Sequence, residues 1–194
     1  MPTFTVHALP ESTAEAARQS TSAVPAVEGD GPYPLRCCLT DDLDGAGVIL
    51  ASVMPFRGES PYAAASPVYV HAERCPGHAG TPGAIPEMLR GRLLSVRAYD
   101  GAHMLTGTEV LPGTELDGAI DRLLGDAPGA YLHVHFAGPG CYACRIDRAA
   151  STYRTMSGRS VRWATSRPAF TRSSSPPHTG SSCSTERTPS NPPS

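Results

Sequence analysis

Two short segments place histidines and cysteines at spacings that metal sites use. The segment HAERCPGH contains His71 and Cys75, and the segment YLHVHF contains His133 and His135. Because side chains alternate between the two faces of a strand, His133 and His135 share one face, which is a geometry found in metalloenzymes. Cys75 or Cys141 would complete a tetrahedral set. A zinc-dependent enzyme that uses His71, Cys75, His133, His135 and Cys141 is therefore one hypothesis for this chain.

A simpler interpretation of YLHVHF is a half-buried strand, and it is the one that we favour. Its polar face would hold Tyr131, His133 and His135, and its apolar face would pack into the core. A tetrahedral metal site would still need ligands from distant segments. The favoured prediction is a binding or interaction module for an unknown ligand or protein, without a cofactor. Its expected ligand-binding residues are His133, His135 and Arg145.

The segment GCYACRID holds two cysteines, Cys141 and Cys144, that are three positions apart. A turn at GPG followed by a returning strand is the expected structure. On a regular strand Cys141, Ala143 and Arg145 share one face, and the next residue of each belongs to the other face. The two sulfurs would then point apart and could not bind one ion, so this segment is interpreted as a piece of sheet.

A third hypothesis is a redox switch through Cys37, Cys38 or Cys141. The adjacent pair Cys37-Cys38 resembles a redox device. In a reducing compartment, however, one buried thiol and one partly exposed thiol is the simpler expectation for such a pair.

Charge and composition exclude several other classes of function. The chain has 194 residues and no lysine, and residues 1–150 carry 10 arginines and 17 acidic residues, a net charge of −7. Such a surface repels a phosphate backbone, so no nucleic-acid partner is expected. No segment has the roughly 18 apolar residues of a membrane span, and the first residues do not form a secretory signal. A cytoplasmic protein without a membrane partner is expected.

The chain divides by composition into residues 1–149 and residues 150–194. The second part is rich in Ser, Thr, Pro and Arg and ends SSSPPHTGSSCSTERTPSNPPS. It has too few apolar residues to offset the entropy of ordering, so a disordered tail is expected. The abrupt loss of acidic residues suggests the hypothesis that this tail is an unselected extension.

Residues 1–149 are expected to form a single α+β domain with a mainly antiparallel sheet. One amphipathic helix is predicted over about 115–125, because its apolar residues recur at helical spacing. A weaker helix begins near Ser12. Alternation and β-branched residues predict strands in 47–56, 66–72, 93–99, 103–110 and 131–136. Asp100-Gly101 predicts a two-residue hairpin turn between two of them.

Four segments in order carry a resemblance to a known family: PYPLRCCL, SPYAAASPVYVHAERC, LLSVRAYD and YLHVHFAGPGCYACRIDRA. Together they resemble an uncharacterised bacterial group, domain-of-unknown-function family 1203, over about residues 1–149. That family usually has a cysteine where this chain has Leu35, whereas the cysteines here are Cys37 and Cys38. The resemblance implies a boundary near residue 149 but no reaction, ligand or catalytic residue.

Overall fold

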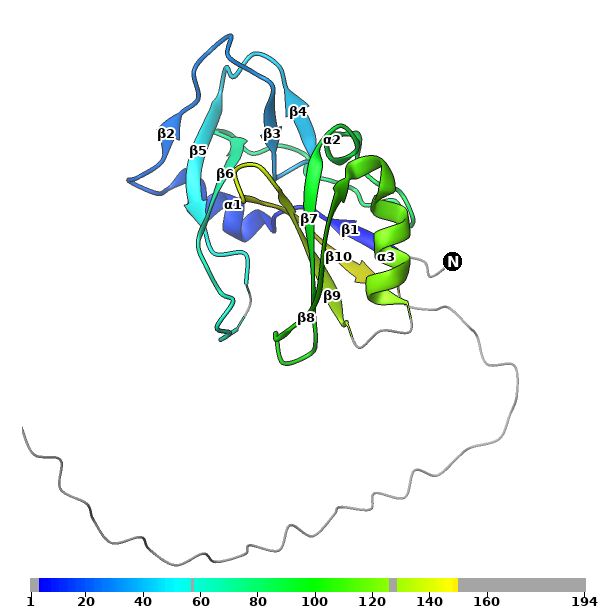
Figure 1. Cartoon of the computed structure of the whole chain (residues 1–194). Helices are drawn as coiled ribbons and strands as arrows, with labels where there is room; N and C mark the ends of the chain where they lie inside the picture. The colour runs from blue at the N-terminus through cyan, green and yellow to red at the C-terminus, as the bar shows by residue number, and fades with distance from the viewer. Residues whose placement is uncertain (1–3, 57, 126–128, 150–194) are drawn as a thin grey trace, which may run out of the picture. The chain divides into compact units, whose positions relative to one another are not determined.

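The computed structural model describes residues 4–56, 58–125 and 129–149, and these form two five-stranded sheets with three α-helices (Figure 1). All but one of the strand pairs are antiparallel, so the predicted α+β class is confirmed. The tail of residues 150–194, predicted to be disordered, lies outside the described residues.

The first sheet, sheet A, is antiparallel throughout and has the strand order β1-β10-β9-β7-β8. Its strands are β1 (Phe4–His7), β7 (Leu93–Tyr99), β8 (Leu105–Pro112), β9 (Tyr131–Phe136) and β10 (Tyr142–Arg148). Strands from both ends of the domain therefore meet in one sheet. The predicted strands at 93–99 and 131–136 are confirmed with the same bounds.

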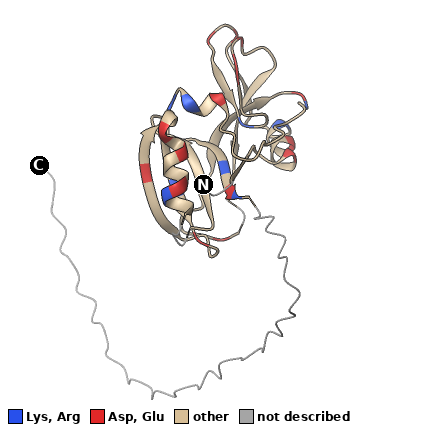
Figure 2. Ribbon diagram, turned by 90° about the vertical axis from the view of Figure 1, so that its right-hand side faces the viewer, with Lys and Arg blue, Asp and Glu red and all other residues tan. Residues whose placement is uncertain are grey.

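Helix α3 (Leu116–Leu124) covers one face of sheet A, after the 3-10 turn η1 (Gly113–Glu115). The predicted helix is thus confirmed. Its apolar stripe is inaccessible to solvent, and each large buried side chain contributes about 1.5–3 kcal/mol. Charged residues of both signs lie along its outer side (Figure 2). The buried stripe consists of Leu116, Ala119, Ile120 and Leu124.

The second sheet, sheet B, has the strand order β2-β5-β6-β3-β4. Its strands are β2 (Val24–Pro25), β3 (Tyr33–Leu35), β4 (Thr40–Asp42), β5 (Val48–Val53) and β6 (Ser66–His71). Only β3 and β6 run parallel, with Leu35 opposite Tyr69. This parallel pair brings the chain after β3 and the chain after β6 to the same end of the sheet.

The two sheets share a core in which Tyr142 of β10 packs with the apolar residues of sheet B and of helix α1 (Glu11–Arg18). Helix α1 is the weak helix expected near Ser12, and its buried residues are Ala14 and Ala17. A short helix α2 (Glu87–Arg90) leads into β7. Arg36, only 1% exposed, also joins the sheets, because its Nε donates to the carbonyl oxygen of Tyr142 over 2.8 Å.

Strand β10 departs from the regular alternation that the sequence predicted. The register against β9 shifts between Tyr142 and Cys144, so Ala143 is the extra residue of a β-bulge. Tyr142 consequently pairs opposite His135, and Arg145 pairs opposite His133. The assignment of Tyr142 and Arg145 to opposite faces was therefore wrong, although the segment is a strand as expected.

The turn between β7 and β8 is also longer than predicted. Strand pairing ends at Tyr99 and Leu105, and Asp100 Oδ1 accepts from the amides of Ala102 and Met104. The prediction of a two-residue turn at Asp100-Gly101 was therefore wrong. His103, in this turn, has a φ of 62°, in the left-handed region that non-glycine residues seldom occupy.

Candidate functional site

Three cysteines and one histidine gather at one end of sheet B. The potential ligand atoms of Cys37, Cys38, His71 and Cys75 all lie within 4.8 Å of one another. Cys37 is buried, and the other three residues are partly exposed. We refer to these four residues as the Cys₃His cluster.

The parallel pairing of β3 and β6 creates the Cys₃His cluster. The amide of Arg36 donates to the carbonyl oxygen of Tyr69 over 2.9 Å, so the turn after β3 begins beside the end of β6. That turn is closed by a hydrogen bond from the Leu39 amide to the Leu35 carbonyl. It presents Cys37 and Cys38 to His71, the last residue of β6, and to the loop that follows.

The separation of Cys37 and His71 in the Cys₃His cluster matches that of a tetrahedral zinc site, and no pair of ligand atoms is more than 4.8 Å apart. The Cys37 sulfur lies 3.5 Å from Nδ1 of His71. Zinc bonds of about 2.3 Å to sulfur and about 2.0–2.1 Å to nitrogen place neighbouring S and N ligands about 3.6 Å apart, and two sulfurs about 3.8 Å apart. Shifts of about 1 Å or less would therefore bring all four atoms onto one ion.

The two adjacent thiols, Cys37 and Cys38, have pKa values that are shifted in opposite directions. The interaction between the two neighbouring thiols lowers the pKa of Cys38 and raises the pKa of Cys37. The Thr40 hydroxyl, 3.0 Å from the Cys38 sulfur, also lowers the pKa of Cys38. Cys38 is thus the more acidic of the two thiols, and the thiolate is the form of cysteine that acts as a ligand or nucleophile.

The surroundings of the Cys₃His cluster hold its histidine in place and leave a route to solvent. Arg18 of α1 donates from Nε to the His71 carbonyl oxygen over 3.0 Å. A cavity of about 490 Å³ is lined by Cys37 and Cys75 among other residues. An ion could reach the sulfurs through this cavity, as a functional metal site requires.

The five metal ligands proposed from the sequence do not stay together in the structure. His71 and Cys75 belong to the Cys₃His cluster, whereas His133 and His135 lie on β9 of sheet A. Cys141 lies directly before β10, and its sulfur accepts from Nη2 of Arg36 over 3.0 Å. The sequence analysis considered Cys37 and Cys38 as redox residues or plain thiols but not as metal ligands, and the structure confirms that one is buried and one partly exposed.

The second candidate region is the face of sheet A opposite α3, where the predicted ligand-binding residues lie. Three neighbouring strands place Arg97, His133 and Arg145 directly beside one another in one row. His133 and His135 are only 1% and 7% exposed. The expectation of a half-buried strand was therefore wrong, because β9 is buried on both faces.

Aromatic rings surround His133 on this face, and Arg97 and Arg145 lie on either side of it. Its ring centroid lies within 5.5 Å of four aromatic rings, those of Phe56, Tyr99, Tyr131 and Tyr142. Burial is the main reason that the pKa of His133 falls to about 3, and nearby His135 and Arg145 contribute. Burial likewise lowers the pKa of His135 to about 4. Both rings are therefore neutral at pH 7.

Arg145 is already occupied by contacts within the domain. Its guanidinium contacts both carboxylate oxygens of Asp147 at 2.8–3.1 Å and lies 3.8 Å from the centre of the Tyr131 ring. Asp147 also lies 3.3 Å from Nε2 of His7. The positive charge of Arg145 is thus balanced internally.

The fold and site define a small two-sheet α+β protein with a cysteine-rich potential metal site. Residues 32–148 match the model of a family described as "Protein of unknown function (DUF1203)", and the chain belongs to this family. The matched residues include the complete Cys₃His cluster as well as β9 and β10. Searches of the curated proteins and of the solved structures gave no significant match. Among the described residues, no helix is long and apolar enough to span a membrane.

Proposed function

We propose that this protein is a metal-binding module that holds one zinc ion in the Cys₃His cluster. The observation that carries the proposal is the convergence of four potential ligand atoms within 4.8 Å. Three sulfurs and one imidazole form a soft donor set of the kind that binds zinc, whereas calcium and magnesium require oxygen ligands.

The number of ligands indicates a structural ion. Four protein ligands fill the tetrahedral shell of zinc and leave no position for water or substrate, unlike the three ligands of a catalytic site. The ion would connect the turn after β3 to the end of β6 and to the loop that contains Cys75. Because these segments are distant in the sequence, metal binding would stabilise their pairing in the folded protein.

Metal content of the purified chain tests this proposal. The full chain is purified under reducing conditions without added metal, reconstituted with zinc, dialysed and measured by elemental analysis. We expect one zinc per chain in the wild type and in the control Cys183→Ser, whose cysteine lies outside the matched family region. We expect substoichiometric zinc in Cys38→Ser and Cys75→Ser. Equal zinc in all four proteins, or dialysable zinc in the wild type, would contradict the proposal.

Cobalt provides a second measurement that does not depend on stability. Cobalt(II) bound tetrahedrally by thiolates has intense visible and near-ultraviolet absorption, whereas cobalt in water has neither feature. We expect this spectrum from the wild type and its disappearance when zinc is added in equal amount. A variant that folds but lacks the spectrum would identify a ligand, so a loss of metal can be distinguished from a loss of folding.

Reversible thiol oxidation is a second candidate function that the same geometry favours. The sulfurs of Cys38 and Cys75 lie within 4.8 Å, and both residues are partly exposed. Peroxide would oxidise the Cys38 thiolate to a sulfenic acid, and attack by the Cys75 thiol would form a disulfide and release water. Mild peroxide should then remove two hydrogens from the mass of the metal-free chain, and a reductant should restore them. A mass increase by oxygen alone would argue against this pair.

A further inference from the structure

Arg97 of β7 differs from most other arginines of the domain because it has no acidic partner. Among the described residues, no carboxylate forms an ion pair with Arg97, and its Nε lies 3.5 Å from the Ser95 hydroxyl. Arg145, two strands away in the same row, has Asp147, and Arg122 has Glu109. A partly buried guanidinium without a counter-charge favours the binding of an anion.

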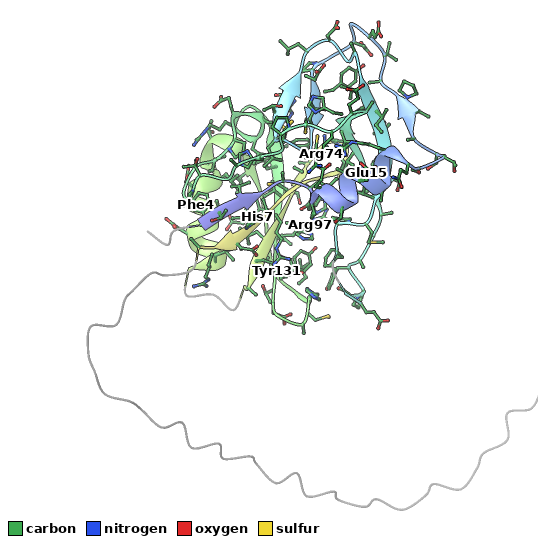
Figure 3. All side chains as sticks on the ribbon, turned by 180° about the vertical axis from the view of Figure 1, so that it is seen from behind. Phe4, His7, Glu15, Arg74, Arg97 and Tyr131 are labelled. Carbon is green, nitrogen blue, oxygen red and sulfur yellow. The ribbon has the colours of Figure 1, made fainter. Side chains whose placement is uncertain are left out.

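A small cavity lies at Arg97. It has a volume of about 240 Å³ and is lined by Arg97 and His135 of sheet A, by Tyr62 and its neighbours from the loop before β6, and by residues of the turn between β9 and β10. This volume is below the usual range of about 300–1,000 Å³ for drug-sized ligands. The cavity therefore suits an ion or a small ligand. Figure 3 labels Arg97 in its place among the side chains of the domain.

His135 lines the cavity and carries a buried hydrogen-bond acceptor on its ring. Its Nδ1 lies 3.1 Å from the carbonyl oxygen of Gly140. A carbonyl oxygen only accepts, so Nδ1 carries the proton, and in the neutral ring Nε2 is an acceptor. This Nε2 is buried and has no hydrogen-bond partner among the described residues. An unpaired buried acceptor is costly, so a ligand that donates to it would be favoured.

We propose that this cavity binds a protonated phosphate group, either as the free ion or as a small monoester. Two phosphate oxygens would accept hydrogen bonds from the Arg97 guanidinium, and the P–OH group would donate to Nε2 of His135 after the buried ring turns toward the ligand. The two side chains thus require an anion that is also a hydrogen-bond donor. Sulfate has the same shape and charge sign but no proton at neutral pH, and would leave Nε2 unpaired.

Arg145 provides the matched control for Arg97. Both arginines flank His133 in the same row of sheet A, on β10 and β7 respectively. Arg145 is paired with Asp147 and does not line the cavity. A general effect of positive charge on this face would respond to loss of either arginine, whereas the proposed site responds only to loss of Arg97.

Calorimetric titration with inorganic phosphate and with sulfate, at pH 7 and constant ionic strength, tests this proposal. We expect the wild type to bind phosphate about tenfold more tightly than sulfate, because only phosphate satisfies the acceptor. Arg97→Gln should weaken phosphate binding about tenfold or more, and Arg145→Gln should leave it unchanged. His135→Phe should retain anion binding but reduce the ratio of phosphate to sulfate affinity to about one.

Several results would overturn the assignment. They are equal binding of phosphate and sulfate by the wild type, retention of phosphate binding in Arg97→Gln, and loss of binding in Arg145→Gln. Thermal melting of each variant without anion shows that it is folded before it is titrated. A second titration at about pH 5.5, where a monoester with a second pKa of about 6 keeps its proton, compares methyl phosphate with inorganic phosphate. Binding of either ligand supports the site, and the tighter one identifies its natural form. If neither inorganic phosphate nor methyl phosphate binds, the proposal is contradicted, and this result does not depend on whether the Cys₃His cluster holds zinc.

Discussion

The buried ring of His133 should make the domain less stable in mild acid by an amount that can be worked out from its surroundings. In the unfolded chain a histidine has a pKa of about 6.5, whereas burial lowers the pKa of His133 in the folded domain to about 3. Above pH 6.5 the ring is neutral in both states. Below pH 6.5 only the unfolded state gains the proton, so the free energy of unfolding falls as the pH falls, down to about pH 3.

The magnitude follows from the same two values. Between pH 7.5 and pH 5.0, protonation of one unfolded histidine lowers the free energy of unfolding by about 2 kcal/mol. The substitution His133→Phe removes this contribution and keeps a ring that suits the aromatic neighbours. It breaks no hydrogen bond at Nδ1, which has no partner among the described residues. The loss of stability between the two pH values should therefore be about 2 kcal/mol smaller in the variant than in the wild type.

Urea unfolding at pH 7.5 and pH 5.0 measures this difference. A chelator and a reductant are present throughout, because metal affinity also depends on pH. Val134→Ala is the control, since Val134 lies on the same strand, faces the core between sheet A and helix α3, and has no titratable group. It should lower stability equally at both pH values. The reasoning is refuted if His133→Phe loses as much stability between the two pH values as the wild type does.

Other parts of the fold give further expectations. Gly113→Ala should lower the free energy of unfolding in urea by about 3 kcal/mol, because its Cβ would overlap the Leu89 carbonyl oxygen. Gly138→Ala meets nothing within 4 Å and should change this free energy by less than about 0.5 kcal/mol. Arg36→Lys should cost about 2–4 kcal/mol, since lysine keeps the charge but loses the forked contacts to Tyr142 and Cys141; an unchanged melting temperature would contradict this role. Asp41→Asn should lower the free energy of unfolding by only about 1 kcal/mol, because its contacts of 2.7 and 3.0 Å with Arg92 are partly exposed. Urea unfolding at high salt should show a smaller loss, since salt screens the pair.

Local patterns in the sequence were sufficient to predict most of sheet A and its helix α3. The helical spacing around Ile120 and the alternation in β7 and β9 depend on neighbouring residues only, so both could be predicted. The bulge at Ala143 could not, because it is defined by the register against β9. The burial of His133 also depends on distant residues, since Phe56 covers the face that the sequence indicated as polar.

The Cys₃His cluster shows the same limit at the level of the site. His71 and Cys75 were candidates because they lie close together in the sequence. Cys37 and Cys38 join them only through the parallel pairing of β3 and β6, which no local pattern indicates. A useful signal was present, namely two cysteines after one strand and a His-x-x-x-Cys segment after another. Combining them requires knowing that the two strands are neighbours.

Native mass spectrometry of the full chain, reduced and titrated with zinc, tests most directly whether these four residues form a metal site. We expect a single species that carries one zinc ion and has lost the protons of the coordinating thiols, and we expect Cys75→Ser to remain metal-free under the same conditions. A wild-type chain that keeps its metal-free mass in excess zinc would contradict the account.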